Sequence, residues 1–319
     1  MRFLRFGTAM ILTAVLVMAV AFALGEGAGI SPEINTEYKT DLYPYVVHTA
    51  SADWYIAKAD IERSGLDELW AELSALIEDQ EADFADARTA LSGYLCEPVP
   101  KVRILTDFCE HAEAAKVGAA CYNSRGNFIK LFRDWFHVRA SLLHEYVHYL
   151  TFHCTDVVIR EGFWAEGIAD YISVLACRNR LSCSVNMGLD AELVKYWKEQ
   201  GVWDPEYDCV QSTVYYYGMA EAYRAGVMDG TTHFAVSNTD VRRAEGFARN
   251  PRADDLSFKE AACMMVFLIE TYGKDTVFLN WNRDPENMQD VFGMSFPELY
   301  EEWASWNTRK CEEMHIVLK

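Results

Sequence analysis

The sequence predicts an α+β protein that is predominantly helical, with a small mixed β-sheet in its N-terminal part. Short strand-like runs separated by turn-forming residues lie before residue 135. Beyond residue 135 the apolar residues recur at helical intervals almost to the end of the chain. Of the 319 residues, 51% are hydrophobic and 24% are charged. This balance is typical of a globular protein and excludes a disordered chain or a coiled-coil rod.

The predicted sheet comes from three stretches. Residues 43–58 are rich in apolar and aromatic side chains and are expected to form a strand. Residues 102–106 alternate between apolar and polar side chains, as a short strand does. Residues 117–122 and 128–132 flank Asn123-Ser124-Arg125-Gly126, a turn composition that predicts a β-hairpin.

The remaining periodic stretches predict helices. The stretch after the first strand predicts a long amphipathic helix, either continuous or broken. Residues 135–152 are apolar on most sides, which indicates a buried helix. Residues 237–255 are polar and predict a surface loop. Helices are predicted over residues 61–91, 135–152, 163–176, 212–228, 258–272 and 295–308, with Gly273 ending the fifth.

The first 24 residues have the pattern of an export signal. Arg2 and Arg5 precede the apolar run 8–24, and Ala21-Phe22-Ala23 provides the small-x-small pattern that signal peptidase cuts. We expect residues 1–24 to be a cleaved signal peptide and the protein to be secreted or extracytoplasmic, in the periplasm or cell envelope. The alternative is an uncleaved N-terminal anchor, because residues 8–24 are just long enough to span a bilayer. Any membrane attachment is expected through this run alone.

Nine cysteines agree with export, because thiols pair in an oxidising compartment. At most four disulfide bonds can form, leaving one odd thiol. Cys177 and Cys183 are close enough in sequence to pair, and so are Cys109 and Cys121. Cys263 lies in an apolar helical pattern and is expected to stay outside any disulfide. The cysteines lack C-x-x-C spacing, which disfavours a cysteine-liganded zinc site.

The charge balance excludes one class of partner. With 29 Lys and Arg against 48 Asp and Glu, the formal net charge is −19, and no run of five basic residues occurs. A surface that grips phosphates is therefore not expected, and nucleic acid is excluded as a partner. The acidic surface favours cationic peptides.

The predicted buried helix carries His144-Glu145-Tyr146-Val147-His148, an H-E-x-x-H motif. Two histidines four residues apart on a helix differ by about 40° in direction, so both rings can reach one metal ion at about 2.0–2.1 Å. Zinc suits these ligands best. Glu145 lies beside the liganding face, where a general base acting on water is expected. A pair of hydrogen-bonded core histidines is the alternative, but burying both rings and a carboxylate without a charge partner is costly.

A catalytic zinc ion needs a third protein ligand. One known arrangement places a histidine six residues after the second histidine, but Cys154 stands there, and His153 points to another side of the helix. The other arrangement takes a glutamate from the next helix, and Glu166 is in that position. Asp170, one helical turn later, could accept the free ring N–H of a liganding histidine and fix its tautomer.

These residues resemble the gluzincin zinc metallopeptidases, a peptidase-MA-like family of the His-Glu-x-x-His…Glu type. The resemblance rests on the motif at 144–148 and on Trp164-Ala165-Glu166-Gly167-Ile168-Ala169-Asp170-Tyr171, within residues 130–175. It implies a zincin-like catalytic lobe over residues 25–180 and a helical C-terminal lobe over residues 181–319. The implied roles are one Zn²⁺ on His144, His148 and Glu166, proton transfer by Glu145, and support from Asp170.

The resemblance also implies a donor for the oxyanion of the transition state. Gluzincins commonly take it from a tyrosine or histidine in the downstream helical region. Here Tyr216 and Tyr217 are expected to serve, with Tyr215 and His233 as further candidates. A peptide substrate is expected to add as a strand at the sheet edge beside the metal, at Phe128–Leu131.

The sequence thus predicts a zinc-dependent metallopeptidase that hydrolyses peptide bonds, with a peptide or protein as its substrate. The first alternative is a gluzincin-like module that retains zinc for binding or interaction and has no peptidase activity. The presence of Glu145 disfavours it, because a binding module needs no base. A zinc hydrolase acting on other bonds is the second alternative.

Overall fold

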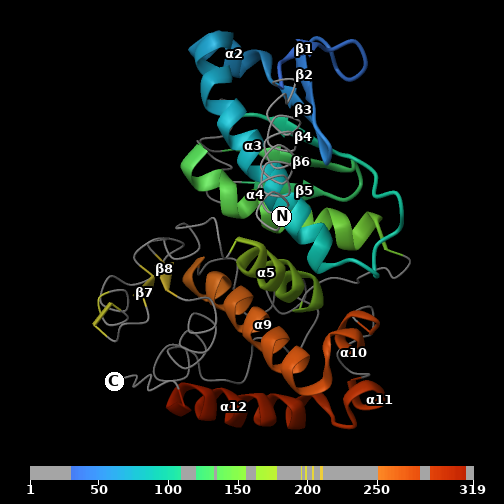
Figure 1. Ribbon diagram of the computed structural model, residues 1–319, viewed down its shortest axis with the longest axis vertical. Coiled ribbons are helices and arrows are strands. Elements are labelled where there is room, and N and C mark those ends of the chain that lie inside the picture. The colour runs from blue at the N-terminus through green and yellow to red at the C-terminus, as the bar shows by residue number, and fades with distance from the viewer. Residues whose placement is uncertain are drawn as a thin grey trace, which may run out of the picture.

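The computed structural model describes residues 30–108, 120–132, 135–155, 163–177, 251–280 and 288–313, together with 195, 198–199, 203–204 and 209–210. This part of the chain is α+β and predominantly helical, with a small mixed sheet, as predicted. In Figure 1 the sheet and the long helix α3 fill the upper half of the molecule, and α5, α9 and α12 are stacked below them.

The main sheet has six strands in the order β1-β2-β3-β4-β6-β5. Strand β4 pairs in parallel with β3 on one side and with β6 on the other, and the remaining pairs are antiparallel. The strands are β1 (Glu33–Ile34), β2 (Tyr45–His48), β3 (Ala52–Ile56), β4 (Val102–Thr106), β5 (Ala120–Asn123) and β6 (Phe128–Leu131). The predicted strand at 102–106 and the predicted hairpin at the turn 123–126 are both confirmed.

The prediction of one strand over residues 43–58 is wrong, because the stretch forms the hairpin β2–β3. The Thr49 side chain closes its turn by donating from Oγ1 to the carbonyl of Ala52 at 2.8 Å. Glu81 holds the same turn, since its carboxylate accepts the backbone N–H of Ser51 at 3.1 Å. The turn residues are small and include no glycine or proline, so the strongest sequence signals of a turn are missing here.

Helices α2 (Lys58–Ser64) and α3 (Leu66–Ala90) confirm the long helical stretch and show that it is broken. The break is at Gly65, which has φ 81°. A residue with a Cβ atom rarely adopts this conformation, so glycine is the residue type that lets the chain turn here. Helix α3 then buries Leu73, Ile77 and Phe84 on one side, as expected of an amphipathic helix.

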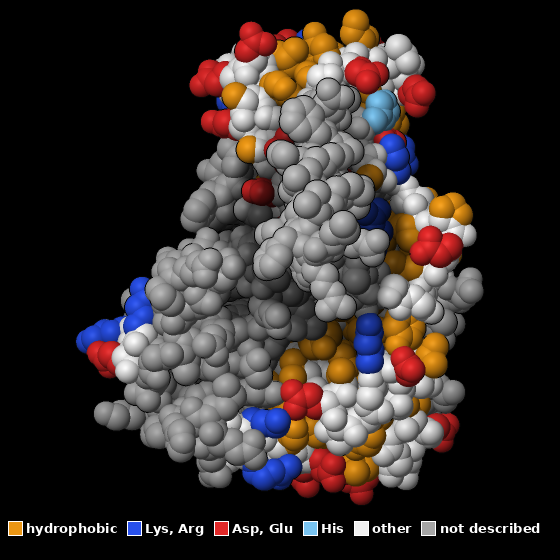
Figure 2. All heavy atoms as spheres, viewed as in Figure 1, with side chains coloured by type: hydrophobic (Ala, Val, Ile, Leu, Met, Phe, Trp, Pro, Cys, Tyr) orange, Lys and Arg blue, Asp and Glu red, His pale blue; other side chains and the backbone are white. Residues whose placement is uncertain are grey.

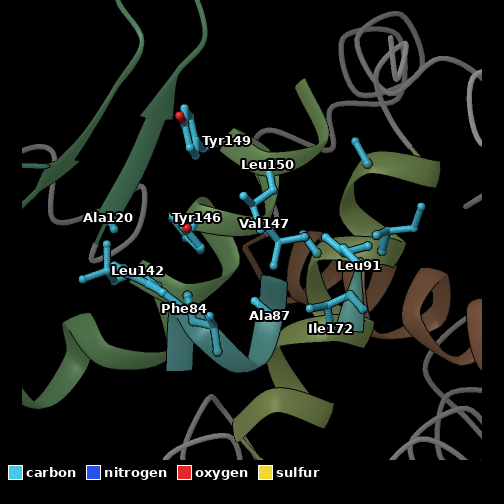
Figure 3. Packing of buried hydrophobic residues seen from close by; sticks show 14 of the residues in the cluster. Phe84, Ala87, Leu91, Ala120, Leu142, Tyr146, Val147, Tyr149, Leu150 and Ile172 are labelled. Atoms are coloured by element: carbon cyan, nitrogen blue, oxygen red, sulfur yellow. The ribbon is translucent and has the colours of Figure 1, made fainter. Parts of the chain in front are cut away.

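Helix α4 (Trp135–His153) is the centre of the core, packed against α3, α5 (Phe163–Cys177) and the edge strand β5. Both helices confirm the predicted ones. Tyr146, Val147 and Leu150 are fully buried on α4, and the Tyr146 ring stacks on Phe84 of α3 with centroids 3.9 Å apart. Figure 3 shows these side chains interlocked between the helices. Such packing fixes the directions of these buried side chains of α4.

The C-terminal helices continue the same core. Helix α9 (Pro251–Tyr272) packs along α5 and buries Met264, Phe267 and Leu268, while α12 (Phe296–Glu313) lies against α9. Helix α9 starts earlier than predicted, so residues 251–255 of the expected loop are helical. Proline is favoured at the first helical position, and Pro251 occupies it. The predicted helix at 212–228 lies outside the described residues.

Several short elements were not predicted. They are β7 (Trp203–Asp204), paired with β8 (Cys209–Val210), and the helices α10 (Lys274–Phe278) and α11 (Met288–Phe292). Each has five residues or fewer, which is too few for a helical period to appear in the sequence.

The cysteine predictions are tested in part. Cys263 is buried on α9 and forms no disulfide, as expected, and its thiol faces Asn307 Oδ1 at 3.6 Å. Cys121 also carries a thiol outside any disulfide. Its suggested partner Cys109, and Cys183, lie outside the described residues.

The described surface agrees with the acidic composition. Figure 2 shows Asp and Glu side chains spread over the upper and lower ends of one face, with Lys and Arg side chains between them. Among the described residues, no helix has both the length and the apolar character needed to cross a membrane. The predicted signal segment, residues 1–24, lies outside the described part of the chain.

Candidate metal centre

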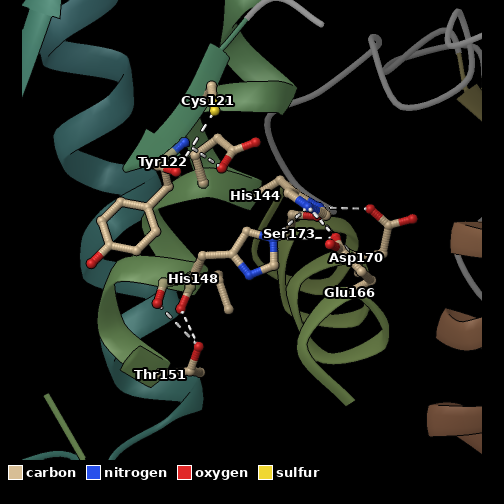
Figure 4. A network of polar contacts seen from close by, with 10 residues as sticks. Cys121, Tyr122, His144, His148, Thr151, Glu166, Asp170 and Ser173 are labelled. Atoms are coloured by element: carbon tan, nitrogen blue, oxygen red, sulfur yellow. Dashed lines mark hydrogen bonds and ion pairs between the residues drawn. The ribbon is translucent and has the colours of Figure 1, made fainter. Parts of the chain in front are cut away.

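The two histidines of the motif point from α4 toward α5. His144 and His148 are one helical turn apart, and their Nε2 atoms are 3.0 Å from each other. Their side chains are 16% and 10% exposed, so the site lies just below the protein surface. Figure 4 shows both rings directed at the same space between the two helices. The helical spacing therefore brings both rings to one place, as the sequence predicts.

Glu166 of α5 completes a triangle with the two rings. Its Oε2 atom lies 3.2 Å from the Nε2 atoms of both His144 and His148. Ligand atoms about 2.0–2.1 Å from a tetrahedral ion are about 3.3 Å from one another, so a triangle of this size fits around one ion. These three residues form the one group of potential ligands that the described residues bring together. They could hold a metal ion, and their two nitrogens and one carboxylate are a donor set that suits zinc.

Asp170 holds one of the rings in place. It lies on α5 one turn after Glu166, its side chain is 8% exposed, and its Oδ1 atom is 2.9 Å from His144 Nδ1. A ring that donates its Nδ1–H to Asp170 has its lone pair on Nε2, directed at Glu166 and the presumed ion position. His148 differs, since its buried Nδ1 atom has no hydrogen-bond partner among the described residues.

We expect the Asp170→Asn variant to bind Zn²⁺ about 10–100-fold more weakly than the unchanged protein, because the amide fixes the His144 tautomer less strongly than the carboxylate does. A competition assay with a chromogenic chelator measures this affinity. Ser173→Ala is the matched control, since Ser173 lies on the same helix and its hydroxyl donates to the backbone carbonyl of Asp170, at 3.0 Å. Equal affinities of the two variants would contradict the role given to Asp170.

Glu145 stands beside the triangle and contacts the sheet. Its Oε2 atom accepts the backbone N–H of Tyr122, on the edge strand β5, at 2.8 Å. Burial raises the pKa of Glu145, and the neighbouring His148 and His144 offset this only in part. A carboxylate with a raised pKa takes up a proton more readily than an exposed one, which is what a general base needs.

The three ligand side chains influence one another's charge. Burial alone would lower the pKa of His144, but its hydrogen bonds to Asp170 and Glu166 raise it well above 6.5. Burial would raise the pKa of Glu166, yet His148 and His144 hold it far below its usual range. Without a metal ion, the site therefore keeps a proton on His144 against an ionised Glu166.

The affinity for Zn²⁺ is expected to rise with pH. His144 must release its proton before its Nε2 atom can bind the ion, and the raised pKa keeps that proton bound beyond pH 6.5. One released proton corresponds to about tenfold in affinity per pH unit, up to the raised pKa of His144. Above that value the dependence should flatten. Dissociation constants measured at several pH values give the slope, and a flat profile from pH 6.5 upward would contradict the proton on His144.

The same His144 proton affects stability of the metal-free protein. A group whose pKa is raised on folding stabilises the folded state below its unfolded pKa, and this contribution is lost as pH rises through the folded pKa. Glu166 has the opposite sign, because its lowered pKa stabilises the folded state above the ordinary carboxyl range and the contribution is lost in acid. The two effects together favour the ion pair at intermediate pH.

The structure brings together five of the residues expected to form the site: His144, Glu145, His148, Glu166 and Asp170. Tyr215, Tyr216, Tyr217 and His233 lie outside the described residues. His153 is exposed at the end of α4 and its Nε2 atom faces the carbonyl of Ser124 at 3.2 Å, away from the triangle, as expected.

One expectation about the site is wrong. Phe128–Leu131, predicted as the edge for a substrate, is β6 and lies inside the sheet between β4 and β5. The edge beside α4 is β5, because the second strand of the hairpin turns back to pair in parallel with β4. The sequence identified the hairpin, but both of its strands have similar apolar content, so the sequence did not indicate which one pairs with β4.

Sequence reasoning also missed two neighbours of the base. The backbone N–H of Tyr122 donates to Glu145. Cys121 lies nearby, since burial is the largest cause that raises the pKa of its thiol, and the negative charges of Glu145 and Glu166 raise it further. The type of a residue does not show which partner its backbone N–H binds. The signal that could have found it is the hairpin itself, which comes directly before α4, the helix that carries the H-E-x-x-H motif.

Comparisons with models of protein families, with curated proteins and with solved structures gave no match to this chain.

Proposed function

We propose that this protein is a secreted or envelope-exposed zinc-dependent metallopeptidase of gluzincin type, with a zincin-like lobe formed by the sheet and helices α3 to α5. One observation carries the proposal. The Nε2 atoms of His144 and His148 and the Oε2 atom of Glu166 converge within 3.0 to 3.2 Å, with the carboxylate of Glu145 next to them. Three ligands from two helices leave the fourth tetrahedral position open, which is the arrangement of catalytic rather than structural zinc sites.

Each residue has a defined task in this proposal. His144, His148 and Glu166 would hold Zn²⁺, which supplies Lewis acidity and lowers the pKa of water at neutral pH. Glu145 takes a proton from the attacking water and later gives it to the departing amine. The Tyr122 N–H keeps the Glu145 carboxylate in a fixed direction for both transfers. Asp170 keeps the Nε2 lone pair of His144 aimed at the ion.

The substrate is proposed to bind along β5, which is the last strand in the order of the described sheet and lies beside α4. Tyr122 on this strand directs its N–H to Glu145, so the backbone groups of β5 that face away from β6 point toward the metal-binding helix. An extended peptide that paired with β5 would therefore bring its own backbone next to Glu145. A peptidase must hold the carbonyl group of its substrate next to its base and its metal ion, and a peptide bound at this edge would be held in that way.

The test measures zinc content and peptide cleavage on the same preparation. Purified full-length protein is expected to contain one zinc ion per chain and to cleave members of a mixed peptide library followed by mass spectrometry. A chelator should stop the cleavage, and added Zn²⁺ should restore it. Stoichiometric zinc with no cleaved peptide would favour the binding module instead. Cleavage that persists in the zinc-free protein would overturn the proposal.

A further inference from the structure

Two cysteines meet at the end of the metal-binding helix, away from the metal triangle. Cys154 directly follows α4 and is fully buried, whereas Cys96 lies in the segment between α3 and β4 and is exposed. The backbone N–H of Cys96 donates to the carbonyl of Cys154 at 2.5 Å. Nearby, the Tyr149 hydroxyl donates to the carbonyl of Pro100 at 2.7 Å. The segment before β4 is thus held against the last turn of α4 at two points.

The side chains of the two cysteines interact as well as their backbones. The Cys96 thiol is among the groups that raise the pKa of the Cys154 thiol, and each residue is a reduced cysteine in this structure. The backbone hydrogen bond places the two residues side by side. Disulfides join neighbouring residues of this kind, because they span Cα–Cα distances of about 4.4–6.8 Å.

We propose that Cys96 and Cys154 are a thiol pair that oxidises to a disulfide and so fastens the end of α4 to the segment before β4. This pairing was not among those suggested by closeness in sequence, because 57 residues separate the two cysteines along the chain. It does not depend on the proposed peptidase activity. An exported protein would meet the oxidising conditions that such a bond requires.

The chemistry is thiol–disulfide exchange with a small-molecule or protein disulfide as the oxidant. The exposed Cys96 thiolate attacks one sulfur of the oxidant, which forms a mixed disulfide and releases one thiolate. The Cys154 sulfur, after losing its proton to water, then attacks Cys96 Sγ, forms the Cys96–Cys154 bond and releases the second thiolate. The pair loses two protons and two electrons, and the oxidant is reduced to two thiols.

The different exposure of the two cysteines determines which of them reacts first. Burial raises the pKa of the Cys154 thiol to about 11, so this thiol is protonated at neutral pH and hidden from large reagents. Cys96 is exposed and can be reached by an oxidant. Cys96 is therefore the attacking residue, and Cys154 resolves the mixed disulfide because it is already in contact.

The bond would stabilise the helix that carries His144 and His148. Cross-linking two residues this far apart restricts the unfolded chain, which predicts a melting temperature about 10 °C higher for the oxidised protein. It would also oppose local opening at the end of α4, where the Cys154 N–H donates to the carbonyl of Leu150 at 2.9 Å. Hydrogen exchange of amides 151–155 should slow by about tenfold or more.

The experiment uses the full chain, reduced with dithiothreitol or oxidised with glutathione disulfide, and maps its peptides under non-reducing conditions. We expect a cross-linked pair of peptides containing Cys96 and Cys154, two hydrogen atoms lighter than the sum of the free peptides. The difference in melting temperature between the oxidised and reduced protein should fall by about 10 °C in Cys96→Ser, because this variant lacks the Cys96–Cys154 bond. Cys96 is exposed, so this variant is expected to fold.

Cys121→Ser is the matched control, since Cys121 is the other described cysteine with an exposed side chain. This variant should keep both the cross-link and the melting shift. Failure to find the Cys96–Cys154 peptide after oxidation would overturn the proposal, and so would a cross-link of Cys96 to another cysteine. An unchanged melting shift in Cys96→Ser would also overturn it. None of these outcomes depends on zinc content or peptide cleavage.

Discussion

Replacing Glu145 by glutamine is expected to lower kcat for peptide hydrolysis by about 10³-fold while zinc stays bound. The amide cannot accept a proton from water at neutral pH, so both proton transfers assigned to Glu145 are lost. The amide oxygen can still accept the Tyr122 N–H that lies 2.8 Å from Glu145 Oε2, so the local structure should persist. Initial rates on a cleaved library peptide, with zinc content measured by atomic absorption, give both quantities.

Glu81→Gln is the matched control for this variant. Glu81 is also partly buried and also accepts a backbone N–H, that of Ser51 at 3.1 Å, but it lies on α3 at the β2–β3 turn. Its replacement should leave kcat close to that of the unchanged protein. Equal cutting by the Glu145→Gln variant and the unchanged protein would show that the assignment of the base is wrong, without bearing on the metal.

Replacing His148 by alanine is expected to remove the metal ion. The triangle loses one of its three ligand atoms, and the remaining His144 and Glu166 hold an ion far less tightly. Loss of a supporting hydrogen bond lowers metal affinity by about 10–100-fold. We expect the loss of a ligand in His148→Ala to lower the affinity for Zn²⁺ by much more than that. In the unchanged protein, zinc at about 100 times its dissociation constant should add about 2.7 kcal/mol to the free energy of unfolding. This gain should vanish in the variant.

His153→Ala provides a control on the same helix. His153 has the same side chain as His148 but is exposed, and its ring faces Ser124 rather than the triangle. Thermal unfolding of each variant with and without Zn²⁺ separates loss of the ion from loss of packing. If His148→Ala keeps its stabilisation by zinc, the triangle is not the metal site and the hydrolase proposal fails with it.

Much of the site could be predicted because it depends on helical geometry. The spacing of His144 and His148 sets their relative direction on any α-helix, and the apolar character of residues 135–152 placed that helix inside the protein. Glu166 and Asp170 are likewise one turn apart, so the helical spacing requires both carboxylates to lie on the same face of α5. The uncertain step was whether the two helices would face each other.

The remaining features depend on contacts between distant segments. The hydrogen bond from Tyr122 to Glu145 involves a backbone group, and backbone groups are the same in every residue. The position of β5 at the sheet edge follows from the parallel pairing of β4 with β6. The meeting of Cys96 with Cys154 follows from the docking of a connecting segment on α4.

The sequence by itself determined the long helices α3, α4, α5, α9 and α12, the residue types of the candidate metal ligands and the side of each helix on which they lie, because these properties repeat with the local period of the backbone. Only the tertiary structure decided that α4 and α5 bring three ligand atoms within 3.2 Å, that β5 is the edge beside them and which cysteines meet. Those outcomes depend on how apolar faces pack over long separations in sequence, and a local pattern does not specify its distant partner.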